Sequence, residues 1–82
     1  MKPYQQVAPH VRERLEIAVL TGEHLSLQWA DEDSDRAYMG RIQPREVVEN
    51  GDGRTYLDAI DEDGAKIRIR VDLIRNLPTP VK

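Results

Sequence analysis

Residues 55–71 read TYLDAIDEDGAKIRIRV and carry the clearest structural signal in the chain. In the second half, three apolar residues alternate with three basic ones, which is the period of a strand with one buried and one wet face. These are Ile67, Ile69 and Val71, and Lys66, Arg68 and Arg70. The first half, residues 55–60, alternates less cleanly. Since Asp63-Gly64 between the halves supplies the positive φ of a tight turn, we expect a β-hairpin.

A different period near the N-terminus predicts one amphipathic helix. Four apolar residues recur at i, i+4, i+7 and i+8 and form a single stripe. The stripe consists of Val11, Leu15, Ala18 and Val19. Pro9 suits the first helical turn, and Gly22 is placed to end the helix in the left-handed conformation. We therefore expect a helix of about three turns that lies on a sheet.

Three further strands are expected between the helix and the hairpin. Residues 24–30 alternate strictly, whereas residues 36–43 form a weaker strand in which Gly40 marks a bend or bulge. Pro44 is expected to break the ladder before a short strand at residues 46–49. After the hairpin, residues 72–77 read as a closing turn whose apolar side chains tuck under the sheet.

The fold class that follows is mainly β with one N-terminal helix, namely a small five-stranded antiparallel barrel of the Sm-like or SH3-like type. We expect an extended arm over residues 1–8, one helix-plus-barrel domain over residues 9–77 and a flexible tail over residues 78–82. The predicted core is Leu15, Val19, Leu25, Leu27, Trp29, Leu57, Ile67, Ile69 and Val71.

Composition argues against several classes of function. The chain has 82 residues, no cysteine and only two histidines, so we expect no thiolate chemistry and no zinc site. No apolar run approaches the ~18 residues of a membrane span, and no signal core is present, which predicts a soluble, cytoplasmic protein.

Catalytic and metal-binding motifs are also missing. Asp31, Asp33 and Asp35 imitate the start of an EF-hand loop, but Arg36 and Ile42 occupy the positions of its glycine and glutamate. There is no nucleophile elbow and no phosphate-cradling glycine loop. We expect no enzyme, no metal, no cofactor and no small-molecule substrate.

The charge pattern bears on whether this chain binds RNA. Net charge is -3, with acidic residues in presumed turns and arginines on presumed strands, so direct RNA binding is the less favoured alternative. It would use Lys66, Arg68 and Arg70, with Tyr38 as an exposed aromatic. Charged turns and wet strand faces that only maintain solubility explain the same pattern.

Two segments resemble the bacterial Rof family, small inhibitors of the transcription termination factor Rho. Residues 4–7, YQQV, and residues 13–18, ERLEIA, look like that family's opening, in which a tyrosine and an apolar residue precede a helix with a Leu-Glu pair. Residues 56–57 and residues 69–74, IRVDLI, resemble its closing strands.

The resemblance implies an Sm-like barrel that binds the RNA-binding domain of Rho and blocks RNA entry, without being a nuclease or a helicase. Residues expected to contact the partner are Tyr4, Arg12, Glu13, Glu16 and Tyr38. An acidic surface would complement a groove that holds phosphates. Two alternatives remain open: Glu13 and Glu16 are ordinary helix charges, or the module binds another protein.

Overall fold

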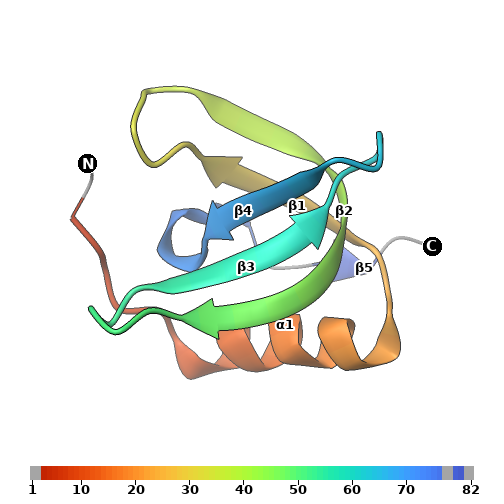
Figure 1. Cartoon of the computed structure of the whole chain (residues 1–82), viewed down its shortest axis with the longest axis horizontal. Helices are drawn as coiled ribbons and strands as arrows, with labels where there is room; N and C mark the ends of the chain where they lie inside the picture. Colours follow the sequence, from red (N-terminus) through yellow and green to blue (C-terminus); the bar gives the residue numbers. More distant parts are fainter. Residues whose placement is uncertain (1–2, 77–78, 81–82) are drawn as a thin grey trace.

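The computed structural model describes residues 3–76 and 79–80, which form one helix packed on a curled antiparallel sheet (Figure 1). The elements in chain order are α1 (Pro9–Thr21), β1 (Leu25–Ala30), β2 (Ala37–Glu49), β3 (Thr55–Ile60), β4 (Lys66–Arg70), the one-turn 3-10 helix η1 (Val71–Leu73) and β5 (Thr79–Pro80).

The hairpin predicted for residues 55–71 is confirmed. β3 and β4 pair antiparallel with Leu57 opposite Ile69. The carboxylate of Asp61 accepts backbone hydrogen bonds from Asp63 at 3.0 Å and Ala65 at 2.9 Å, and Gly64 takes the expected positive φ of 82°. The turn chemistry that the sequence indicated therefore sets the register of the hairpin.

β2 joins the two strands predicted at residues 36–43 and 46–49 into one strand of 13 residues. The prediction that Pro44 breaks the ladder is wrong, because Pro44 is buried and pairs with Ala59. A bulge between Pro44 and Glu46 bends the strand there, and proline is tolerated at bulges. Gly40 is not a bulge, since the register with β1 runs unbroken through it.

The sheet has the order β4-β3-β2-β1-β5. The coarse class, mainly β with one N-terminal helix, is confirmed. Within the described residues five full strands are not present: four antiparallel strands curl into a half-barrel, and β5 contributes two residues, beside Leu25 and Ser26. Thr79 and Pro80 of the predicted tail thus pair with β1, while residues 77–78 and 81–82 lie outside the described residues.

α1 begins at Pro9, and Gly22 caps its C-terminal end, as predicted. Gly22 adopts the left-handed conformation with φ 71°, and its N–H bonds to the carbonyl of Ala18 at 2.9 Å. The helix lies along one side of the half-barrel against β2 (bottom of Figure 1), and Leu15 and Ala18 are its buried residues.

The core fills the space between α1 and the concave side of the sheet. Most predicted members are buried, whereas Trp29 and Ile67 are half-buried at its margin, and Val19 is half-exposed. Buried residues outside the predicted core are Ile42, Ala59 and Ala18, the last of which lies on the predicted helix stripe. The closing turn is confirmed in part, because Leu73 of η1 is buried. Within residues 3–76 and 79–80, no helix is both long and apolar enough to cross a membrane.

Candidate interaction surfaces

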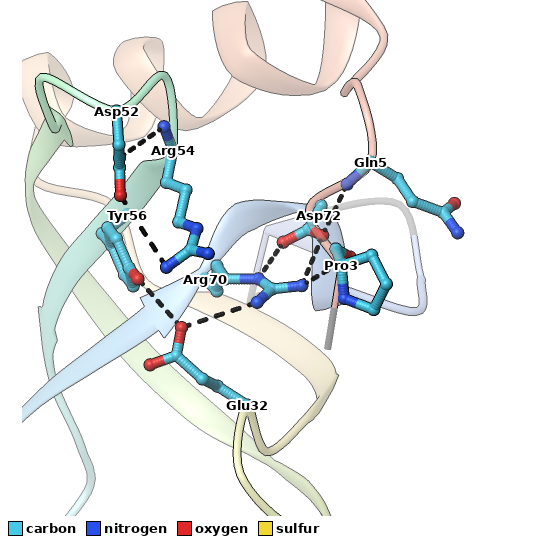
Figure 2. Close-up of polar contacts among 8 residues, drawn as sticks. All are labelled: Pro3, Gln5, Glu32, Asp52, Arg54, Tyr56, Arg70 and Asp72. Atoms are coloured by element: carbon cyan, nitrogen blue, oxygen red, sulfur yellow. Dashed lines mark hydrogen bonds and ion pairs between the residues drawn. The ribbon is translucent and has the colours of Figure 1, made fainter. Parts of the chain in front are cut away.

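Arg70 lies at the end of β4 and is not on the wet face that its alternation predicted. Its side chain is fully buried, and it donates from Nε to Oδ1 of Asp72 at 2.7 Å and from Nη2 to Oδ2 at 2.9 Å (Figure 2). The hydrogen bonds that Arg70 donates to Asp72 raise the pKa of Arg70. Strict alternation failed here because the N-terminal arm and the β1–β2 loop cover this end of the strand.

The same ion pair holds the N-terminal arm. Arg70 Nη2 donates to the carbonyl of Pro3 at 2.9 Å, and the backbone N–H of Gln5 donates to Asp72 Oδ2 at 3.0 Å (Figure 2). The guanidinium also sits over the ring of Tyr4, 5.6 Å from its centroid. Tyr4, a predicted partner contact, is therefore half-buried against the body of the protein.

Glu32, in the β1–β2 loop, connects the pair to β3. Its Oε2 lies 3.6 Å from Arg70 Nη1 and accepts a hydrogen bond from the Tyr56 hydroxyl at 2.8 Å (Figure 2). This hydrogen bond, together with burial, raises the pKa of Tyr56. The Arg70 network thus ties the arm, the β1–β2 loop, β3 and η1 together, and its polar groups are engaged with one another rather than presented to a ligand.

Of the three basic residues proposed to bind RNA on one strand face, only Lys66 and Arg68 are exposed. Arg68 is half-exposed but forms a bidentate pair with Asp58 on β3, from Nε to Oδ1 at 2.7 Å and from Nη2 to Oδ2 at 3.1 Å. That pair lowers the pKa of Asp58. Only Lys66 is exposed with no ion pair among the described residues, so the three predicted cations do not form one basic patch.

Glu13 and Glu16 lie exposed on α1, as predicted. Arg12 bridges Glu16 and Glu49, with Nε 3.1 Å from Glu16 Oε1 and Nη1 3.4 Å from Glu49 Oε2, and both contacts raise the pKa of Arg12. Arg12 therefore serves two carboxylates of its own chain. Glu13 has no ion-pair or hydrogen-bond partner among the described residues, so its charge is free to meet another molecule.

Two apolar side chains accompany Glu13 on the side of α1 that faces away from the sheet. Ile17 and Leu20 follow Glu13 at i+4 and i+7, and they are 51% and 84% exposed. We call Glu13, Glu16, Ile17 and Leu20 the outer helix face. The sequence analysis missed Ile17 and Leu20, although their position off the buried stripe of α1 was the signal that could have found them.

Tyr38 begins a second surface at the open end of the half-barrel. It is exposed, and its ring stacks on Trp29 of β1 with centroids 5.8 Å apart and planes at 30°. Met39, which the sequence analysis did not name, is 74% exposed beside it. These side chains line a cleft of 620 Å³ that is bounded on its other side by Ile67 and Arg68 of β4; we call it the open-end cleft.

Within residues 3–76 and 79–80, no group of three or more histidine, cysteine or acidic residues could hold a metal ion. A scan against models of known protein families and a search of curated proteins each found no match.

Proposed function

We propose that this chain is a non-enzymatic regulator whose outer helix face docks in a basic, nucleic-acid-binding groove of a partner protein, and that this partner is the transcription termination factor Rho. The observation that carries the proposal is the composition of that face: unpaired Glu13 and bridged Glu16 stand beside exposed Ile17 and Leu20. The resemblance to the Rof family supplies the name of the partner.

The carboxylates account for the choice of groove. A site that holds RNA phosphates presents positive charge, and an acidic helix entering it gains the same Coulomb attraction. Among the described residues Glu13 has no ion-pair partner to lose on binding, and Glu16 shares Arg12 with Glu49. This attraction should raise the rate of association with the partner and fix the orientation in which the helix binds.

The apolar pair provides what charge alone does not. Exposed Leu20 and Ile17 can bury their side chains against a partner, and each fully buried aliphatic side chain contributes about 1.5–3 kcal/mol. Rim charges around a small apolar centre are the common anatomy of a protein interface. Binding would then exclude RNA from the groove by occupancy, with no reaction at any residue.

We also propose that the half-barrel is a variant of the Sm-like or SH3-like class. The element order supports this, since after β4 the chain turns through η1 and returns along β1. An isolated bridge joins Trp29 and Ile74, and Arg75 N donates to the carbonyl of Gln28 at 2.6 Å. The returning segment and β5 bring the two ends of the curled sheet toward closure.

Direct RNA binding is not favoured by the described surface. Arg70 is buried on Asp72 and Arg68 is paired with Asp58, so of the three predicted cations only Lys66 is without an ion pair among the described residues. A cytoplasmic location belongs to the same proposal, because transcription termination takes place there in bacteria.

The test is a competition assay with purified Rho and a labelled single-stranded RNA, followed by fluorescence anisotropy. The proposal predicts that the protein displaces the RNA from Rho and does not itself bind the RNA. Replacing Ile17 and Leu20 together by serine should weaken displacement about tenfold or more, while Met39→Ser, an exposed apolar residue on β2, serves as control. RNA that stays bound at saturating protein, or RNA bound by the protein alone, would overturn it.

A further inference from the structure

The open-end cleft offers a second binding surface, away from the outer helix face. In Figure 1 the first half of β2 and the β1–β2 loop lie at the top and α1 at the bottom. Trp29, Tyr38 and Met39 line one side of the cleft and Ile67 the other, so an occupant would touch apolar and aromatic side chains. Its 620 Å³ falls in the usual range of ligand-binding clefts.

In the described part of the chain, the backbone of β4 is unpaired on the side away from β3. Among the described residues β4 pairs only with β3, and it ends the sheet order. The bond from Asp61 N to Ala65 O at 3.0 Å fixes which β4 residues bond to β3. Because antiparallel pairs alternate, Ile67 and Ile69 bond to β3, whereas Lys66 and Arg68 turn their N–H and C=O groups to the free edge.

The charge around the cleft selects a cationic occupant. Asp31 and the β3–β4 turn, residues 61–63, place four carboxylates along it, against two arginines. Arg68 is already neutralised by Asp58, which leaves Arg41. None of the three carboxylates in the turn forms an ion pair within the described residues. An aromatic ring beside carboxylates is the environment that a lysine or arginine side chain prefers.

We propose that the open-end cleft binds an extended, basic segment of a partner protein, which adds as a strand to the free edge of β4 and places a lysine or arginine side chain over Tyr38. Backbone hydrogen bonds to Lys66 and Arg68 supply affinity. The Trp29–Tyr38 pair and the acidic β3–β4 turn supply the preference for a cation. This surface is independent of the outer helix face and does not require that Rho be the partner.

The test uses a capped octapeptide of alternating lysine and valine, with alternating glutamate and valine as the matched acidic probe. Trp29 is the only tryptophan in the chain and lines the cleft, so its fluorescence reports on binding there. Amide hydrogen exchange at Lys66 and Arg68 reports on the edge. We expect the basic peptide to shift the fluorescence and slow exchange at both amides, and to bind at least about tenfold more tightly than the acidic one.

Two variants distinguish binding in the open-end cleft from binding at the outer helix face. Tyr38→Ala should weaken the basic peptide about fivefold, the factor that a cation–π contact of about 1 kcal/mol provides. The pair Glu13→Lys and Glu16→Lys should leave peptide binding unchanged. Equal affinity for both peptides, tighter binding of a single-stranded oligouridylate, unchanged exchange at Lys66 and Arg68 under saturation, or no response up to about 1 mM peptide would each overturn the proposal.

Discussion

Arg70 and Asp72 form a buried bidentate ion pair, with Nε 2.7 Å from Oδ1 and Nη2 2.9 Å from Oδ2. Each partner also forms a hydrogen bond with the N-terminal arm. Arg70 donates to the carbonyl of Pro3, and Asp72 accepts from the N–H of Gln5. These hydrogen bonds to the ion pair, and not strand pairing, hold the arm in place, so the position of the arm depends on the ion pair.

Arg70→Met should cost about 3–5 kcal/mol of unfolding free energy, because it leaves Asp72 buried without its cation. Arg68→Met, two residues away on the same strand, is the matched control. Its pair with Asp58 is half-exposed, so the loss there should stay below about 1 kcal/mol. Urea denaturation of both variants checks the contrast, and equal losses would mean that the Arg70 network is not a buried charge cluster.

Asp58 should titrate below its ordinary pKa of 3.8, since the bidentate contact with Arg68 favours the carboxylate. A depressed pKa in the folded state stabilises the protein above the unfolded-state value, and this contribution is lost as the pH falls through the folded pKa. Asp58→Asn should therefore flatten the stability profile below about pH 4. Carboxyl NMR chemical shifts measure the midpoint directly; a midpoint at or above 3.8 contradicts the prediction.

Leu27→Ala and Leu20→Ala make the same chemical change in opposite environments. Leu27 is fully buried on β1, so its truncation should cost about 2–5 kcal/mol. Leu20 is 84% exposed, and its truncation should change the free energy of unfolding by no more than about 0.5 kcal/mol. Chemical denaturation of the two variants tests the assignment of Leu20 to a free surface, which a large loss at Leu20 would refute.

Much of the fold follows from local signals. The alternation of Ile67 and Ile69, the Asp63-Gly64 turn and the Pro9-to-Gly22 helix limits act within a few residues, so the sequence alone could show them. The bend in β2 could not be placed in the same way. In the sequence alone, Pro44 predicts the end of a strand. In the sheet it lies beside a bulge, where the missing backbone N–H of proline is tolerated.

The candidate surfaces were harder to predict for a related reason. The alternation predicted that Arg70 faces solvent, but two distant segments cover it. Pro3 of the N-terminal arm lies 67 residues away in the sequence, and Glu32 lies 38 residues away. Partner contacts at such separation leave no local pattern. Ile17 and Leu20 were detectable, because an apolar residue off the buried stripe of an amphipathic helix needs a reason to be there.

Charge reversal on α1, measured over a range of salt concentrations, tests the proposed binding of the outer helix face to a basic groove on Rho. The double variant Glu13→Lys, Glu16→Lys is compared with Asp35→Lys, Glu46→Lys, which makes the same change in net charge at exposed sites that form no ion pair within the described residues. Circular dichroism first establishes that both variants are folded.

Binding to purified Rho is then measured by calorimetry between about 50 and 300 mM salt. We expect the wild-type affinity to fall as salt rises, the helix variant to lose at least about tenfold in affinity at the lowest salt, and the control variant to stay within about threefold of wild type. Retained affinity in the helix variant, or an equal loss in both variants, would contradict the claim.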